Sequence, residues 1–549
     1  MKALLIWPIF PETFWSFSEV LKLAGRKAFL PPLGLATVAA LLPQDWEFRI
    51  IDRNFAVLGE DDWNWADIVL LSAMIVQKDD LLGLIREAKS RSKPVAVGGP
   101  YVTSVPDEAK KAGVDYLVMD EGEITIPAFL QHLEANGLSS LPEGAPAFTF
   151  RAKDKQKPEM ALSPIPRFDL LDMPAYDGMS IQYSRGCPFL CEFCDIITLY
   201  GRKPRAKSPK QLIAELEYLR SLGRRGYIFL VDDNFIGNKR NVKQLLVELR
   251  EWQRAHGSPF YFDTEASIDL AADPELIQLM VDCNFTSVFI GIETPDTESL
   301  ALTRKHQNNR NPLIDSVQLI TRAGLRVQCG LIIGFDGERK GAGQRIVQFI
   351  EATNIPTAFF SILQALPNTA LWDRLEREGR LLGNTGDVNQ TSVLNFIPTR
   401  PASDIVQEYV EAFADLYEPK AYLKRTYRYF LELGINKVKN ESAKPAVKAK
   451  KIQVTVRQDP LRGVKRTLQY IRAFFTVCWR QGVIRDTRFL FWRYAARMRR
   501  ERPELLDAFL VICAHNEHFL LFRERVRTQV LAKGTITSDI YSRSVTVHE

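Results

Sequence analysis

The chain has 549 residues, of which 46% are apolar and 25% are charged, and its formal net charge is +6. This length predicts two or three domains, and the composition is that of an ordinary globular protein. Only seven cysteines are present, which argues against a disulfide framework and favours a reducing cytosol. No secretory signal pattern follows the opening MKALLIWPIF, and no apolar stretch is long enough for a bilayer, so we expect no membrane span.

The first 135 residues alternate short β-branched runs with helical patterns. This alternation predicts a doubly wound, Rossmann-like parallel sheet that binds ligands at the C-terminal ends of its strands. The expected strands are 2–7, 47–52, 67–73, 94–99 and 115–121, and the expected helices between them include 32–42, 78–90 and 125–135. The Pro-rich, irregular segment that follows predicts a linker between domains.

A second βα series begins at residue 180. Its expected strands are 180–186, 226–233, 260–266, 286–293, 326–334 and 358–366, with helices such as 208–223 and 241–257 between them. Six βα units predict a partial or complete barrel, with its active site at the C-terminal strand ends.

Beyond about residue 400 the pattern becomes helical, basic and aromatic, and it is interrupted by the Lys/Ala/Pro tract NKVKNESAKPAVKAKK. From Pro401 onward there are 28 Lys and Arg residues against 16 Asp and Glu, whereas the preceding part has 44 against 50. A mildly acidic body therefore carries a strongly basic C-terminal region, and this bias needs its own explanation. We accordingly expect domains at 1–140, 176–400 and 401–549, with the linker at 141–175.

The most specific motif is YSRGCPFLCEFC, which places Cys187, Cys191 and Cys194 after the first strand of the second series. Structural zinc sites use four ligands, and neither a second cysteine pair nor a suitably spaced histidine follows. Three thiolates suit an iron–sulfur cluster that leaves one iron open to a non-protein ligand. Zinc and simple core cysteines are the alternatives.

This Cys-x3-Cys-x2-Cys motif, with Phe193 before its last cysteine, resembles the signature of the radical S-adenosylmethionine (SAM) enzymes. The resemblance implies that the three cysteines hold a [4Fe–4S] cluster whose open iron chelates SAM. Reductive cleavage of SAM then gives a 5′-deoxyadenosyl radical that abstracts hydrogen from the substrate. It also implies that Phe193 lies beside the cofactor.

Other strand ends match this family with decreasing specificity. VDDNFIG, EAS, GIET and GLIIGFDGE end the second to fifth strands of the series. The resemblance implies SAM contacts from polar groups at these ends, because carboxylates accept from hydroxyl and ammonium groups alike, and from a glycine that allows close backbone approach. The residues are Asp232, Asp233, Asn234, Glu265, Glu293 and Gly334. For each acid alone, a solvated carboxylate is the alternative.

The N-terminal domain lacks the G-x-G-x-x-G pattern of dinucleotide sites. Its segments LLSAMI and VGGPYVT resemble the serine loop and the double-glycine loop of cobalamin-binding domains, although a glycine pair at a strand end is often only a turn. The resemblance implies cofactor contacts from Ser72, Met74, Gly98, Gly99 and Thr103. The first histidine of the chain is His132, so we expect cobalamin without a histidine ligand, its lower face toward Met74.

The C-terminal region interleaves arginine with aromatic residues, and residues 421–500 hold 21 basic and 4 acidic side chains. Nucleic-acid binding, interfacial attachment to an anionic membrane and a plain helical cap are three interpretations, of which nucleic acid is the least favoured. His515 and His518 are expected to be packed or surface residues rather than ligands.

Over its full length the chain resembles the cobalamin-dependent radical SAM enzymes (class B radical methyltransferases), in the subgroup that includes hopanoid 2-methylase. The resemblance implies an α/β protein with a Rossmann-like cobalamin-binding domain, a radical SAM (β/α)6 partial barrel and a mainly helical C-terminal domain. It also implies C-methylation of an unactivated carbon in a hydrophobic substrate, such as a hopanoid or another lipid.

The alternatives are a non-methylating radical reaction, such as cyclisation or carbon–carbon bond formation, and a cobalamin- or cluster-based sensor. Expected partners are a lipid or other hydrophobic substrate and an electron donor of the ferredoxin or flavodoxin type. We expect a cytoplasmic location, with peripheral association to the inner membrane surface as an extension of this hypothesis.

Overall fold

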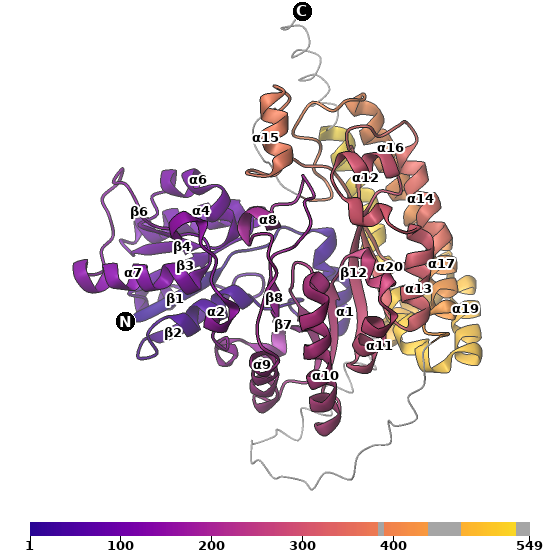
Figure 1. Ribbon diagram of the computed structural model, residues 1–549, viewed down its shortest axis with the longest axis horizontal. Helices are drawn as coiled ribbons and strands as arrows, with labels where there is room; N and C mark the ends of the chain where they lie inside the picture. Colours follow the sequence, from indigo (N-terminus) through magenta and orange to yellow (C-terminus); the bar gives the residue numbers. More distant parts are fainter. Residues whose placement is uncertain (383–388, 437–473, 534–549) are drawn as a thin grey trace, which may run out of the picture. The chain divides into compact units, whose positions relative to one another are not determined.

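The computed structural model describes residues 1–382, 389–436 and 474–533 (Figure 1). The Lys/Ala/Pro tract apart from Asn436, and residues 437–473 of the basic aromatic region, therefore lie outside the described residues. The chain divides into two compact units. The first comprises Met1–Thr13, Leu30–Leu245 and Gln364–Asn389, and the second comprises Phe14–Phe29, Leu246–Leu363 and Gln390–Glu549.

The first unit contains a six-stranded sheet with the order β2-β1-β3-β4-β5-β6, in which every neighbouring pair is parallel. Five of its strands match the expected ones, and the sixth lies within the expected linker. The strands are β1 (Lys2–Trp7), β2 (Glu47–Asp52), β3 (Ile68–Ser72), β4 (Val95–Gly98), β5 (Tyr116–Val118) and β6 (Phe148–Phe150). The Rossmann-like parallel sheet is thus confirmed.

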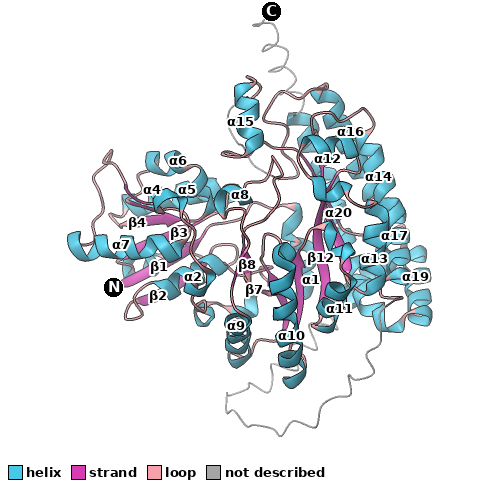
Figure 2. Ribbon diagram, viewed as in Figure 1, coloured by secondary structure: helices cyan, strands magenta, loops and turns pink. Residues whose placement is uncertain are grey.

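Both faces of this sheet are buried, as an all-parallel sheet requires. Alternate residues of β1 enter two different cores, with Leu4 and Ile6 in one and Ala3 and Leu5 in the other. In Figure 2, α4, α5 and α6 lie on one face, and α2 and α7 lie on the other. The helices are α2 (Leu33–Leu41), α3 (Glu60–Trp65), α4 (Lys78–Ser90), α5 (Pro100–Ser104), α6 (Pro106–Lys111) and α7 (Gly122–Asn136).

The first unit also contains the start of the second βα series. Strand β7 (Met179–Ile181) pairs in parallel with β10 (Gly226–Leu230), and a short antiparallel pair joins β8 (Ser184–Arg185) to β9 (Arg205–Ala206). The helices here are α8 (Ile196–Leu199), α9 (Pro209–Ser221) and α15 (Ala370–Arg377). Ser208 and Gln211 cap the start of α9 reciprocally, which explains why the helix begins there.

The second unit contains the later strands of the series, which pair in parallel in the order β11-β12-β13-β14. Helix α10 (Lys239–Ala255) contains the boundary between the two units. The strands are β11 (Phe260–Glu265), β12 (Phe285–Glu293), β13 (Arg326–Ile333) and β14 (Ala358–Ile362). The helices among them are α11 (Pro274–Asp282), α12 (Thr297–Leu302), α13 (Leu313–Ala323) and α14 (Ala342–Thr353).

The chain after residue 400 is helical throughout its described part, as the pattern predicts. Its helices are α16 (Ala402–Leu416), α17 (Pro419–Glu432), α19 (Arg488–Glu501) and α20 (Leu506–Arg525), with a π-helical segment at Arg480–Ile484. Helix α1 (Ser18–Ala24) packs on α20 within the same unit. The expected α/β class with a helical C-terminal region is confirmed.

One helical stretch, Pro503–Lys533, is long and apolar enough by length and composition to cross a membrane. However, 56% of its most apolar window is buried inside the protein. Its phenylalanines at positions 509, 519 and 522 lie in the core. This burial is typical of a core helix.

Candidate functional site

The three signature cysteines lie on one loop between β8 and α8. Gly186 enters this loop with a φ of 94°, and a Cβ there would lie 2.9 Å from the carbonyl oxygen of Gly201. The Cys187 N–H donates to that same carbonyl at 3.2 Å, and the Cys194 N–H donates to the Cys191 carbonyl at 3.2 Å. All seven cysteines lie within the described residues, and none forms a disulfide.

Two aspartates at the end of β10 hold the start of this loop. The Asp232 carboxylate accepts from the backbone N–H groups of Tyr183 and Ser184 at 2.8 and 2.7 Å and from the Ser184 hydroxyl at 2.6 Å. Asp233 accepts from the Gly186 N–H at 2.8 Å. The Asn234 amide lies 4.0 Å from the Cys187 sulfur, to which it donates. The predicted trio is thus brought together with the cysteines, and both aspartates bind backbone.

Burial governs the electrostatics here. It raises the pKa of Asp232 to about 6 and that of Asp233 to about 7. Burial likewise raises the pKa of the Cys187 and Cys194 thiols. Cluster ligation requires thiolates, so loading a cluster releases protons and becomes easier as pH rises.

A buried ion network, absent from the sequence predictions, joins this region to α7. Arg205 donates to both Glu121 oxygens, at 2.8 and 3.1 Å. Arg185, two residues before Cys187, donates to Glu121 at 2.8 Å and to Glu123 at 3.0 Å. All four side chains are at most 11% exposed. The network therefore ties the cysteine loop to the domain that carries the cobalamin-like motifs.

A second ion pair anchors the far end of the loop. Glu192, between two of the cysteines, accepts from the Arg374 guanidinium of α15 at 2.8 Å, and its carbonyl accepts from the Leu371 N–H at 2.8 Å. Phe193 follows as a half-buried side chain. Neither arginine network has a sequence signal, because the partners lie at least 62 residues apart.

The residues expected to contact cobalamin lie at the C-terminal ends of β3 and β4. Gly99 has a φ of 90°, and a Cβ there would collide with the Ser72 hydroxyl oxygen, while a Cβ on Gly98 would lie 2.8 Å from the Val118 carbonyl. Both glycines are therefore required by close backbone packing. Thr103 donates to the Gly99 carbonyl and accepts from the Asp120 N–H, each at 2.9 Å.

Met74 lies at the same edge with 48% of its surface exposed. Its backbone N–H donates to Gln77, and the buried Gln77 amide donates to the Pro8 carbonyl after β1 at 2.7 Å. An exposed thioether is thus held on a fixed turn at the ligand-binding edge of a Rossmann-like sheet. No histidine precedes His132, so the residues fit a cobalamin bound without a histidine ligand.

In the second unit, Glu265, Glu293 and Gly334 end or follow the neighbouring strands β11, β12 and β13. Glu293 is buried, adopts a left-handed φ of 65° and forms an ion pair with Lys305, which sequence reasoning missed. Gly334 has a φ of 105°, a conformation that favours glycine. The strand ends of this unit thus carry two of the predicted acids and the predicted glycine.

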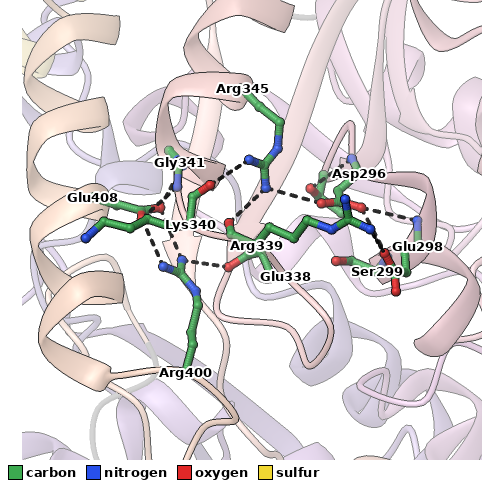
Figure 3. A network of polar contacts seen from close by, with 12 residues as sticks. Asp296, Glu298, Ser299, Glu338, Arg339, Lys340, Gly341, Arg345, Arg400 and Glu408 are labelled. Atoms are coloured by element: carbon green, nitrogen blue, oxygen red, sulfur yellow. Dashed lines mark hydrogen bonds and ion pairs between the residues drawn. The ribbon is translucent and has the colours of Figure 1, made fainter.

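A network of ion pairs is centred on Arg400 and includes Glu338 and Glu408 (Figure 3). Arg400 donates to Glu338 at 2.9 Å and to Glu408 at 3.0 Å, and the Gly334 N–H donates to Glu338 at 2.9 Å. Burial raises the pKa of Glu338 to about 7. The Oε1 atom of Glu338 has no hydrogen-bond partner among the described residues, so a buried acceptor remains available at this strand end.

The donor set fits a cluster better than a single ion. Among the described residues, no group of three or more His, Cys, Asp and Glu side chains is arranged to hold one metal ion. Each cysteine of a cluster binds a different iron, so its sulfurs need not converge on one point. The zinc alternative requires four ligands around one ion and finds no such set in the described part of the chain.

Comparison with known proteins agrees with this assignment. Residues 22–130 match the B12 binding domain, residues 181–350 match the Radical SAM superfamily, and residues 369–532 match a domain of unknown function, DUF4070. The chain is 56% identical over 531 residues to the uncharacterized methyltransferase sll1242 of Synechocystis sp., covering 96% of this chain and 93% of that protein.

It is also 35% identical over 528 residues to the hopanoid C-2 methylase of Rhodopseudomonas palustris, covering 96% of this chain and 94% of that protein. Its fold is similar to that of the cobalamin-dependent SAM radical enzyme OxsB, solved with aqua-cobalamin and SAM bound. The TM-score is 0.54 at 16% identity, covering 97% of this chain and 81% of that chain.

The fold and these matches define a cobalamin-dependent radical SAM enzyme. The chain belongs to this family and is a radical SAM methyltransferase whose cofactors are a [4Fe–4S] cluster, SAM and cobalamin. Such an enzyme needs a substrate and a reductant. Of the functions weighed from the sequence, methyl transfer is therefore the one that these matches support.

Proposed function

We propose that the enzyme transfers a methyl group to an unactivated carbon of a hydrophobic lipid of the hopanoid class. The observation that carries this proposal is the 35% identity to hopanoid C-2 methylase, which extends over nearly the whole of both chains. Such a substrate requires an apolar binding surface, and the second unit offers one.

This apolar surface is built on Trp15, which is 46% exposed. Its indole stacks on Phe359 of β14 with ring centroids 3.7 Å apart and approaches Phe289 of β12 at 5.3 Å. Phe289 alternates along β12 with buried residues of the core, so it points to the sheet face opposite to theirs. Next to Phe289 on this face, Gly291 pairs with Gly330. Glu293 and Lys305 lie over Gly291, and the Phe289 ring lies over Gly330. The exposed Trp15 ring suits a flat hydrocarbon skeleton.

Each part of the chain then has a distinct task. Cys187, Cys191 and Cys194 hold the cluster, while Asp232 and Asp233 fix the backbone of their loop. Glu265, Glu293 and Gly334 orient SAM, and the edge of the first sheet near Met74 and Gly99 holds cobalamin. When bound, the cluster supplies the electron that cleaves SAM and cobalamin supplies the methyl group. The domain bounds expected from the sequence, 1–140, 176–400 and 401–549 with a linker at 141–175, remain part of this proposal.

The test uses the anaerobically reconstituted holoenzyme with methyl-labelled SAM, a chemical reductant and a bacterial lipid extract that contains hopanoids. We expect label in the hopanoid fraction together with 5′-deoxyadenosine. The test variant is Trp15→Ala, which removes the exposed ring of this apolar surface. It should lower labelling of the lipid while SAM binding is retained. Label confined to water-soluble products would contradict the proposed substrate.

The proposal also includes the location of the enzyme and its electron donor. We place it in the cytoplasm, with a ferredoxin or flavodoxin type protein as electron donor. A lipid substrate resides in a membrane, so the enzyme has to meet a membrane surface from the cytoplasmic side. Mixing the reconstituted enzyme with reduced flavodoxin should support SAM cleavage without a chemical reductant.

A further inference from the structure

Exposed apolar side chains are concentrated in one short stretch of the second unit. Seven of the large hydrophobic side chains exposed within the described residues lie between positions 474 and 492, and they are Phe474, Phe475, Trp479, Val483, Ile484, Phe489 and Trp492. Phe489 exposes 76% of its surface. Scattered exposed apolar residues are ordinary, whereas a group of this size marks an interaction site.

These side chains belong to the helical stretch 474–484, which ends in the π-helical segment, and to α19, which packs on that segment. The Trp492 indole N–H of α19 donates to the Gly482 carbonyl of the π-helical segment at 2.9 Å. A Cβ on Gly482 would lie 2.6 Å from the Trp492 indole nitrogen, so glycine allows the ring to lie directly on this segment. Val483 and Ile484 follow immediately along the chain. The exposed residues of the two segments therefore meet at this contact.

Helix α19 has one side buried in the protein and one side exposed to solvent. Its buried side chains are Phe491, Tyr494, Ala495 and Met498, and the helix packs on α17 and α20 (Figure 1). On the solvent side lie Phe489, Arg493, Ala496 and Arg500, spaced as one helical face. We call Phe475, Trp479, Val483, Ile484, Phe489 and Trp492, with the arginines on the same two segments, the α19 face.

The charge of the α19 face is strongly positive. Residues 474–500 contain seven arginines and one acidic residue, Asp486. Arg480 and Arg485 reach Glu517 of α20 and so secure the π-helical segment to the core. Arg493, Arg497, Arg499 and Arg500 all belong to the exposed side of α19. The face thus combines apolar side chains with cationic groups that remain in water.

We propose that the α19 face docks on the surface of an anionic lipid membrane. Aromatic and aliphatic side chains would enter the boundary between head groups and acyl chains, and the arginines would contact anionic head groups. Exposed Val483 and Ile484 favour lipid over nucleic acid, because aliphatic side chains offer bases no stacking surface. The docking gives the enzyme access to a membrane-borne substrate, and in that respect it rests on the proposed function.

The test is sedimentation of the full-length holoenzyme with lipid vesicles, which requires no turnover and so is independent of the proposed reaction. Vesicles of phosphatidylcholine with about one third phosphatidylglycerol should bind the enzyme, and binding should weaken as salt is raised. Arg493→Gln with Arg500→Gln should lower the partition coefficient about 30-fold, since each arginine near an anionic surface contributes about one factor of five. Phe475→Ser, Ile484→Ser and Phe489→Ser together should lower it at least as much.

Matched controls remove comparable groups elsewhere. Val57→Ser with Leu162→Ser and Ile165→Ser replaces three exposed apolar side chains of the first unit, and Lys110→Gln with Lys111→Gln removes two exposed charges. Both controls should bind vesicles like the wild type. Equal loss of binding in the controls, equal binding to pure phosphatidylcholine, or salt-dependent binding to DNA with none to vesicles would overturn the proposal.

Discussion

The strand ends of the two units carry the same kinds of polar residue and use them differently. In the first unit, Asp232 and Asp233 accept hydrogen bonds from backbone N–H groups around the cysteine loop. In the second unit, Glu293 is paired with Lys305, and Glu338 accepts both from Arg400 and from the Gly334 N–H. A carboxylate bound to backbone fixes a loop, whereas one paired with a side-chain cation can accept a cationic ligand group in exchange. The first arrangement suits a rigid cluster site and the second suits a ligand that comes and goes.

The largest expected effect concerns the first unit, in which a buried ion network holds the cysteine loop. Arg205→Met leaves the buried Glu121 and Glu123 with too few cations, and removing one partner of a buried network costs about 3–5 kcal/mol. We expect a large drop in the urea midpoint of the protein. Arg151→Met is the control. Arg151 is 52% exposed, and its ion pair with Asp120, with Nε and Oδ2 3.5 Å apart, is accessible to water. Similar midpoints for both variants would show that the network does not hold the loop.

The titration of Glu338, in the second unit, should make the stability of the protein depend on pH. Its folded-state pKa is raised from 4.5 to about 7 by burial, so the protonated form is favoured on folding. That stability is present below pH 4.5 and is lost as pH rises through 7, by about 3 kcal/mol in total. The urea midpoint of the wild type, measured relative to that of Glu338→Gln, should therefore decrease as the pH is raised from 5 to 8. Parallel pH curves for the two proteins would rule out this titration.

Glu293→Gln tests whether an ion-paired carboxylate contacts SAM. A hydrogen bond to a charged group contributes about 1.5–3 kcal/mol, so we expect SAM to bind roughly 10- to 100-fold more weakly in equilibrium dialysis. Glu298→Gln is the control, because its side chain is 56% exposed and pairs with Arg339 on the surface. Unchanged SAM affinity in Glu293→Gln would remove this residue from the cofactor site.

The smallest expected effect concerns the glycine pair of the first unit. Gly99→Ala forces a Cβ toward Ser72 at a positive φ, which costs about 1–2 kcal/mol, and should reduce the cobalamin retained after reconstitution. Gly83→Ala is the control, because no atom lies within 4 Å of a Cβ there and the residue is inside α4, where alanine stabilises by about 0.5–1 kcal/mol. Full cobalamin retention in Gly99→Ala would contradict the predicted contact.

The sequence predicts the parts of this molecule that depend on local pattern. The parallel sheets follow from short β-branched runs, and the cluster site follows from three cysteines within eight residues. The ion partners could not be predicted in the same way. Arg205 and Glu121 are 84 residues apart, and Arg400 and Glu338 are 62 apart, so only the folded chain reveals which charges meet. Likewise, the pattern shows aromatic residues and arginines in the C-terminal region, but only burial separates exposed Phe489 from buried Phe491.

The central claim is that Cys187, Cys191 and Cys194 together hold the cluster that cleaves SAM. The most direct measurement is the iron and sulfide content of each single Cys→Ala variant after anaerobic reconstitution, with 5′-deoxyadenosine formation measured in parallel. The control is Cys283→Ala, which alters a buried cysteine outside the loop. Each loop variant should lose the [4Fe–4S] cluster and fall to background cleavage, while Cys283→Ala keeps both. Wild-type iron content and cleavage in any loop variant would contradict the account.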